Sequence, residues 1–411
     1  MKSALLDQKF WRHFAKNHWE KKPLLLRNVK SDLIEMTADE IFDLLVLYAD
    51  RCRQINDPTG FKFYTDGIKA QEEDVLSVLP EKSDKSLAGY HKRMNTLFSD
   101  YCLVCDELLQ VNLKKQHLLT DFTDQLYRHV GFPNRFSEMG LYLGNYKKTP
   151  FGVHVDSCGV FSFPVAGTKK FRLWNAAYGE KHPELDRTFN YEKNKKHSQL
   201  LEVGPGDMTY WPSSEWHIAE SDGSFSATWS LGVWVDQPHK DMVSDSVKEL
   251  LDKKLGSSGT QVMTAFKRLH NKSGEITGLP KSFSNSLKLL QNLSPLELQD
   301  ILSRNWMKHI SLQGFKTMPY EALELSAKSC LHLRNDRSPI LWQKSLVTSN
   351  NYYASFGGVL IESSSTGLLN LIKDLNAGNS CAIQPYLKGA SSKKDLHSLQ
   401  TLADAGAFNI L

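Results

Sequence analysis

The first third of the chain has a mostly helical hydrophobic pattern. Residues 5–19 place aromatic side chains at helical spacing between charged ones, which predicts an amphipathic helix. The apolar run at 24–26 predicts a short buried strand. Thr37 and Glu40 form a capping-box pair before the run IFDLLVLYA, so a second helix is expected to begin near residue 38.

A third helical pattern covers about residues 100–129. It contains Cys102 and Cys105, which have CxxC spacing but no second pair elsewhere in the chain. We therefore expect two buried helix cysteines here and no metal or redox site.

Residues 138–235 have a different pattern. Short apolar runs such as GLYLGNY, KFRLW and SATWSLGVW are rich in aromatic and β-branched residues and are separated by Gly, Pro and Asp. Such runs at this spacing predict an all-β barrel or sandwich.

Helical spacing returns after Pro238, in the runs VKELLDKKL and QVMTAFKRL and in a helix that Ser294 and Pro295 would begin. The last part, residues 316–411, contains a probable strand pair, SPILWQKS with YYASFGGVLIE, and two helices that end at glycines. Short helices with a strand pair suggest a winged-helix-like domain.

Composition indicates an ordinary globular protein. A hydrophobic share of 41% and a charged share of 23% exclude disordered, collagen-like and coiled-coil chains. The net charge of +4 gives no bulk attraction to nucleic acid or membranes. The six cysteines suit a reducing compartment, and the chain has no apolar run long enough to span a membrane. A cytoplasmic protein without a membrane partner is expected.

The sequence Gly-Val-His-Val-Asp at 152–156 carries the strongest chemical signal. On a strand, residues i and i+2 share a face, so His154 and Asp156 could present an imidazole and a carboxylate to one metal. The segment GDMTYWPSSEWH supplies His217 as a third ligand from another strand. Two His and one carboxylate on one face of a metal form the triad of non-haem Fe(II) oxygenases, which leaves positions open for a co-substrate and dioxygen.

A lysine follows His154 by fifteen residues. Lys169 and Lys170 stand side by side in GTKKFRLW, and neighbouring strand residues face opposite ways, so only one can point inward. A buried lysine requires an anionic partner, which makes the carboxylate of a bound co-substrate the natural one.

The runs FGVHVDSCGVFSFPVAGTKKFRLW and GDMTYWPSSEWH resemble the Jumonji-C (JmjC) hydroxylases, and most closely the cupin-4 or ribosomal oxygenase subgroup. The opening WRHFAKNHWEKKPLLLRN is also similar to that subgroup. The resemblance implies an α+β fold: a double-stranded β-helix (a cupin/JmjC jelly-roll barrel) with N-terminal helices, a helical dimerisation segment and a C-terminal winged-helix-like domain. The expected divisions are residues 1–239 for the catalytic domain, with its β core at about 138–235, then 240–315 and 316–411.

Carried over by position, the resemblance implies that His154, Asp156 and His217 bind Fe(II) and that Lys169 binds the C5 carboxylate of 2-oxoglutarate. Tyr142 matches a position that faces the co-substrate, and Ser230 matches a last-strand position near the same pocket. Three residues depart from the family pattern and are expected to change the pocket wall more than the metal site: Gly140, Cys158 and Pro164.

The expected activity is Fe(II)- and 2-oxoglutarate-dependent hydroxylation, with dioxygen, of an amino-acid side chain in a protein or peptide, of the ribosomal-protein type. The stretch between Glu180 and Gln199 is expected to shape the acceptor site. A homodimer is expected from the family architecture, and mixed charge in the C-terminal domain argues against nucleic-acid binding. Methyl-lysine demethylation, tailoring of a peptide natural product and a non-catalytic cupin binding module are the alternatives.

Overall fold

The structure is a computed structural model that describes residues 4–235, 239–255, 270–276, 278, 281–319, 322–334, 338–387 and 392–411. The chain divides into two compact units, Met1–Asp236 with Gln313–Pro319 and Gln237–Leu312 with Tyr320–Leu411. The division into three domains at residues 239 and 315 stays a prediction. No helix in the described ranges combines the length and the apolar character needed to cross a bilayer.

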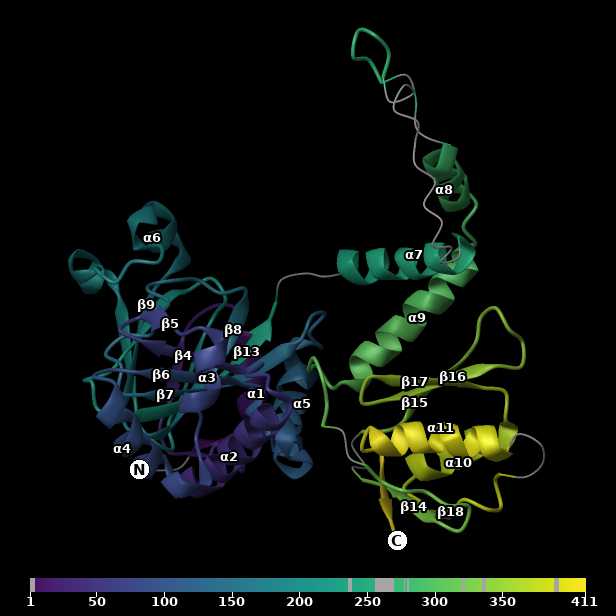
Figure 1. The fold of residues 1–411 in the computed structure, drawn as a ribbon, viewed down its shortest axis with the longest axis horizontal. Helices are drawn as coiled ribbons and strands as arrows, with labels where there is room; N and C mark the ends of the chain where they lie inside the picture. The colour runs from purple at the N-terminus through teal and green to yellow at the C-terminus, as the bar shows by residue number, and fades with distance from the viewer. Residues whose placement is uncertain are drawn as a thin grey trace. The chain divides into compact units, whose positions relative to one another are not determined.

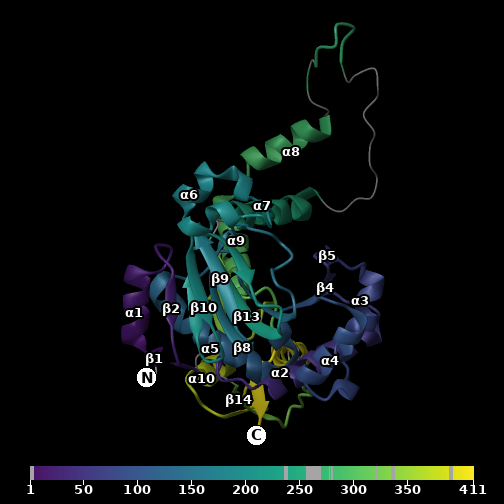
Figure 2. The ribbon, with the colours of Figure 1, turned by 90° about the vertical axis from the view of Figure 1, so that its left-hand side faces the viewer.

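The first unit is built on two antiparallel sheets (Figure 1). Eight strands form the larger sheet in the order β2-β11-β8-β13-β7-β6-β4-β5, and three form the smaller one in the order β10-β9-β12. Figure 2 shows β2 on one flank of this unit and β5 on the other, as that order requires. The strands are β2 (Leu24–Leu26), β4 (Phe61–Thr65), β5 (Ile68–Lys69), β6 (Cys102–Asp106), β7 (Ser137–Gly144), β8 (Cys158–Ala166), β9 (Lys169–Trp174), β10 (Gln199–Val203), β11 (Met208–Trp211), β12 (Trp216–Glu220) and β13 (Ser226–Trp234). A separate parallel pair joins β1 (Ala4–Leu5) to β3 (Val29–Lys30).

Helices cover one face of the larger sheet. Alternate residues of its central strands, such as Leu141, Phe161 and Trp229, are buried in a core shared with Phe14 and Leu45 of the helices. Residues between them on the same strands face the other way, toward the smaller sheet. The helices and 3₁₀ segments are α1 (Gln8–Asn17), α2 (Ala38–Ile55), α3 (Glu72–Val78), η1 (Lys82–Asp84), α4 (Leu87–Leu97), η2 (Leu108–Val111), α5 (Leu113–Val130), α6 (Ala176–Lys181), η3 (Pro183–Leu185) and η4 (Glu192–His197).

The sequence located the start of α2 correctly. The Glu40 amide donates to Thr37 Oγ1 at 3.2 Å, and the Thr37 amide donates to Glu40 Oε2 at 2.9 Å. This reciprocal pair satisfies two amides that the helix cannot pair internally.

A second core joins the two sheets. It contains Val160 and Trp211 of the larger sheet with Phe171, Leu173 and Leu201 of the smaller one. Because both sheets contribute side chains, they are fixed as two stacked layers.

The predicted helix over residues 100–129 is wrong in its first third. Cys102–Asp106 is strand β6, paired between β4 and β7, and only Leu113–Val130 is helical. Residues Cys102 to Cys105 are buried on both faces of the sheet, and periodicity cannot separate such a short apolar run from a helix. The two cysteines are buried and unpaired as expected, but on a strand.

The second unit begins with helices α7 (His239–Leu255), α8 (Lys281–Gln291) and α9 (Pro295–Ser311). Ser294 Oγ accepts from the Glu297 amide at 3.3 Å, and Pro295 opens α9 as predicted. The predicted helical run at 261–269 lies outside the described residues.

The remainder of this unit has two three-stranded sheets and two helices around one core. The sequence predicted two strands here, and the structure has three, β15, β16 and β17. Left-handed backbone at Gly357 and Gly358 turns the chain and divides the second predicted strand into β16 and β17. Gly378 and Gly406 follow the two helices with left-handed φ, as expected. The elements are β14 (Cys330–Leu333), β15 (Leu341–Lys344), β16 (Tyr352–Phe356), β17 (Val359–Ser363), α10 (Thr366–Asn376), β18 (Cys381–Ala382), α11 (Ser392–Asp404) and β19 (Phe408–Ile410).

Candidate metal centre

A cavity of about 290 Å³ lies in the first unit. Its wall includes the strand residues that face away from the helices, such as Val160 and Ser162 of β8 and Thr228 of β13, together with Phe171 and Ala219 of the smaller sheet. The alternation of side chains along the strands therefore gives one face to the core and the other to the cavity.

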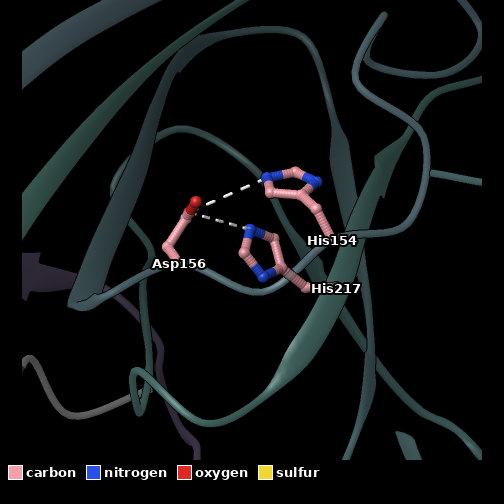
Figure 3. A group of neighbouring side chains, drawn as sticks. All are labelled: His154, Asp156 and His217. Atoms are coloured by element: carbon pink, nitrogen blue, oxygen red, sulfur yellow. Dashed lines mark ion pairs between the residues drawn. The ribbon is translucent and has the colours of Figure 1, made fainter. Parts of the chain in front are cut away.

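Three potential metal ligands meet in this cavity (Figure 3). Asp156 Oδ2 lies 3.7 Å from His154 Nε2 and 3.4 Å from His217 Nε2. One ligand atom from each residue falls within 4.8 Å of the others, and no other such group of His, Cys, Asp or Glu occurs in the described ranges. The three side chains converge as the sequence predicted.

Backbone pairing holds the two histidines beside each other. The His154 amide donates to the His217 carbonyl at 3.0 Å, and the His217 amide donates back at 2.7 Å. His217 lies in β12 as expected, but His154 forms only an isolated bridge in the loop that connects β7 to β8. The prediction that His154 and Asp156 lie on a strand is therefore wrong, although their side chains reach the same point.

The other ring nitrogen of each histidine is used in the same way. Nδ1 of His154 donates to the Gly152 carbonyl at 2.9 Å, and Nδ1 of His217 donates to the Glu215 carbonyl at 3.2 Å. Because a carbonyl can only accept, both rings carry their proton on Nδ1 and leave the Nε2 lone pairs facing Asp156.

Electrostatics favour the neutral form of His217. Burial lowers its pKa to about 4, and the neighbouring His154 ring acts in the same direction. A neutral imidazole at neutral pH is the form that binds a metal. The donor set of two neutral Nε2 atoms and one carboxylate fits a divalent transition metal with open positions.

A buried cation lies in the same cavity. Lys169 is 1% exposed, and its Nζ lies 3.7 Å from the centre of the Tyr146 ring and 3.4 Å from Ser226 Oγ. Burial lowers its pKa to about 7. No carboxylate in the described part of the chain forms an ion pair with it, so an anion bound in the cavity would stabilise its charged form.

The neighbouring lysine faces the other way. Lys170 keeps 37% of its side chain exposed and lies 3.6 Å from Glu202 of β10. Strand alternation thus places Lys169 inward and Lys170 outward, the orientation that the sequence favoured.

Two buried hydroxyls in the cavity wall match a bound carboxylate. Thr149 Oγ1 and Thr228 Oγ1 have no hydrogen-bond partner among the described residues, and their residues are 7% and 3% exposed. An unpaired buried hydroxyl is costly, so two of them in the wall of the cavity that holds Lys169 fit an anionic ligand that accepts hydrogen bonds.

The remaining predicted site residues have mixed positions. Tyr142 of β7 and Ser230 of β13 line the cavity. Among the residues described as lining it, Gly140, Cys158 and Pro164 do not occur, so the expectation that these departures change the wall is wrong.

Sequence reasoning missed several residues of the cavity wall. Thr228 could have been found from its i,i+2 relation to Ser230 on one strand. Tyr146 and Thr149 lie in the loop after β7, where no periodic pattern predicts which way a side chain points. Arg187, from the segment between β9 and β10, also lines the cavity.

The comparisons with known proteins agree with this geometry. Residues 116–241 match the family model described as the JmjC domain. Three solved structures of YcfD from Escherichia coli are 15% identical to this chain. One structure of YcfD covers 98% of both chains with a TM-score of 0.52, and one of ribosomal oxygenase YcfD covers 98% of both with 0.51. A third, of the ribosomal oxygenase with cobalt and succinic acid, covers 97% of this chain and 98% of that one with 0.51. The search of curated proteins finds no match.

The match to YcfD extends over both units, but at 15% identity it establishes the fold alone. The family match is limited to the segment that contains β7 to β13 and all three candidate metal ligands. Residues 116–241 of this chain therefore match the JmjC domain, and the chain has the fold seen in YcfD.

Proposed function

We propose that this chain is an Fe(II)- and 2-oxoglutarate-dependent oxygenase that hydroxylates an amino-acid side chain in a protein, of the ribosomal-protein type. The observation that carries the proposal is one cavity that holds both the convergent triad His154, Asp156 and His217 and the buried, unpaired cation Lys169. A purely structural barrel has no need for this combination.

Each residue has a defined part. His154 and His217 would hold Fe(II) through Nε2 while their Nδ1 protons stay on backbone carbonyls, and Asp156 would supply the third ligand. Lys169 would bind the distal carboxylate of 2-oxoglutarate. The iron with its co-substrate and dioxygen supplies the oxidising power that converts a C–H bond to C–OH.

The cavity wall would hold the co-substrate in one orientation. Thr149 and Thr228 would donate their free hydroxyls to the carboxylate that Lys169 binds. Tyr142 and Ser230 would contact the co-substrate from the strand faces. Together these donors satisfy the anion and exclude water from the buried end of the cavity.

A protein acceptor is preferred because the solved structures of similar fold are described as ribosomal oxygenases. In one of them succinic acid, the product of 2-oxoglutarate turnover in this class, is present with cobalt. The acceptor residue would enter at the open side of the cavity near Asp156, whose side chain is 37% exposed.

Dimerisation, the winged helix and the cytoplasmic location complete the proposal. Helix α8 leaves Phe283, Leu287 and Leu290 exposed at i, i+4 and i+7, which makes one apolar face suited to a second copy of the chain. The domain after α9 would be a winged-helix-like accessory element without a nucleic-acid partner. The six cysteines, all in the described part of the chain, form no disulfide, which agrees with a reducing cytoplasm.

The test is succinate release from 2-oxoglutarate by the full chain reconstituted anaerobically with Fe(II), then exposed to oxygen with and without a ribosomal-protein extract. The extract should stimulate turnover, and His154→Ala should abolish it. His197→Ala, which changes an exposed histidine at the end of η4, is the matched control. Absence of succinate release from the wild-type chain under all conditions would refute the proposal.

A further inference from the structure

The segment between β9 and β10, residues 175–198, forms a small cap on the smaller sheet. Leu185 and Tyr191 are buried against Trp174 and Ile218. Tyr191 Oη also donates to Glu220 Oε1 of β12 at 2.6 Å. The cap is therefore a packed part of the first unit.

The cap is joined directly to the segment that carries the metal ligands. The Arg187 amide donates to the Val153 carbonyl at 2.7 Å, and the Val153 amide donates to the Thr188 carbonyl at 2.9 Å. His154, the next residue, pairs with β12 on its other side. Residues 153–154 thus lie between β12 and the cap and are hydrogen-bonded to both.

The close approach depends on an unusual backbone at two positions. Gly152 has φ +67°, and a Cβ there would lie 2.4 Å from the Arg187 carbonyl oxygen. Arg187 itself has φ +56°, which is uncommon for a residue with a long side chain. Backbone strain at such a residue persists when the surrounding structure fixes it, and it is frequent at ligand-binding positions.

Arg187 contributes to the wall of the same cavity as the three candidate metal ligands. Its side chain is 66% exposed, and its Nε lies 3.9 Å from the carboxylate of Asp186, which is itself 60% exposed. An ion pair of that length in water contributes little, so the guanidinium keeps its donors available.

The other charges of the cavity would be balanced once Fe(II) and 2-oxoglutarate are bound. Lys62 is paired with Asp106 at 2.6 Å. The two charges of Fe(II) and the charge of Lys169 would be offset by Asp156 and by the two carboxylates of 2-oxoglutarate. Arg187 is then the cation of the described cavity wall that lacks a compensating anion.

We propose that Arg187 is the acceptor-recognition residue and binds a carboxylate of the polypeptide, next to the residue that is hydroxylated. A guanidinium offers five N–H donors and pairs with a carboxylate through two parallel hydrogen bonds. The inference rests on the proposed oxygenase function and adds a substrate class to it: acceptors with Asp or Glu beside the modified position.

The test measures binding of fluorescein-labelled peptide sets to the full chain loaded with Mn(II) and 2-oxoglutarate without oxygen. Three sets share a randomised central residue and differ in flanks that are acidic, neutral or basic. The acidic set should bind about tenfold more tightly than the neutral one. Arg187→Gln should remove this preference, and Arg187→Glu should favour the basic set. Lys193→Gln removes a charge from an exposed position of the cap outside the cavity wall and should change nothing.

Two results would overturn the proposal: equal or absent binding of the acidic set by the wild-type chain, or an acidic preference that survives Arg187→Gln. Succinate release without an acceptor separates this failure from failure of the oxygenase. A wild-type chain that releases succinate but shows no acidic preference fails in acceptor recognition alone, whereas a chain that releases no succinate fails as an oxygenase.

Discussion

The cavity presents two cations in opposite environments. Lys169 is 1% exposed, and burial lowers its pKa to about 7, whereas Arg187 keeps 66% of its side chain in solvent. A buried cation destabilises the fold until an anion arrives, so its position is suited to a small ligand that becomes enclosed. An exposed guanidinium has little desolvation cost and suits a surface that must bind and release a macromolecule. The difference between the two environments therefore suits Lys169 and Arg187 to two different kinds of ligand.

Loss of a metal ligand should reduce turnover more than any other change, because the proposed reaction takes place at the metal. His217→Ala should weaken metal binding beyond the roughly 10–100-fold that loss of an outer-sphere partner costs, and should abolish turnover. Calorimetric titration with Mn(II) measures it, with His197→Ala as the control. Retention of wild-type metal affinity in His217→Ala would remove His217 from the site.

Lys169→Met tests the buried end alone. Hydrogen bonds to charged groups contribute about 1.5–3 kcal/mol, so 2-oxoglutarate should bind roughly 10–100-fold more weakly while Mn(II) affinity stays unchanged. Lys170→Met, on the outer face of the same strand, should leave both affinities as they are. An effect of equal size from both variants would contradict the assignment of Lys169.

The pH dependence of co-substrate binding sharpens the contrast, because the buried lysine titrates near neutrality when no anion is bound. Its folded-state pKa of about 7 lies below the ordinary lysine value of 10.5, so the unfolded chain binds more protons between these two pH values. Stability of the empty protein should therefore rise across that window. Affinity for 2-oxoglutarate, which pairs with the charged form, should fall above pH 7 by up to about tenfold per unit.

Calorimetry at pH 6.5 and 8.5 measures the change in affinity, and thermal melts of the empty protein measure the change in stability. In Lys169→Met the pH dependence of 2-oxoglutarate affinity should be lost. A wild-type affinity that does not change across this range would contradict a titrating lysine in the cavity.

The smallest effect is expected from the hydroxyls of the wall. Thr228→Val should weaken 2-oxoglutarate binding by about 2–10-fold, the value of a neutral hydrogen bond. It should also raise the thermal midpoint of the empty protein slightly, because an unpaired buried hydroxyl is removed. Thr209→Val is a useful comparison, since Thr209 is also buried on a strand but donates to the Ser162 carbonyl at 3.4 Å. If Thr228→Val destabilises the empty protein, its hydroxyl is satisfied in some other way.

The sequence predicted the groups whose chemistry and spacing are both restrictive. The triad follows from residue types that suit a metal, although His154 and Asp156 lie in a loop. The inward orientation of Lys169 follows from the alternation of side chains along β9. Strand alternation could also have identified Thr228. The sequence did not reveal that β6 is a strand, because a fully buried strand and a buried helix both give continuous apolar runs.

Loop residues were beyond sequence reasoning for a different reason. Arg187 reaches the cavity through a left-handed backbone and through hydrogen bonds that join Arg187 and Thr188 to Val153, none of which has a periodic signature. Gly152 stands in the metal-binding motif that the sequence identified. The reason for a glycine there, a close approach to the Arg187 carbonyl, can be seen only in the folded structure.

The most direct test of the central claim is whether the metal and Lys169 bind two ends of one molecule. Calorimetric titration of 2-oxoglutarate into the full chain, with and without Mn(II) and without oxygen, measures this coupling. One equivalent should bind with Mn(II) present and more than about tenfold more weakly without it, while glutarate, which lacks the 2-oxo group, should show no such dependence. Equal binding of 2-oxoglutarate with and without the metal, or no binding at all, would contradict the account.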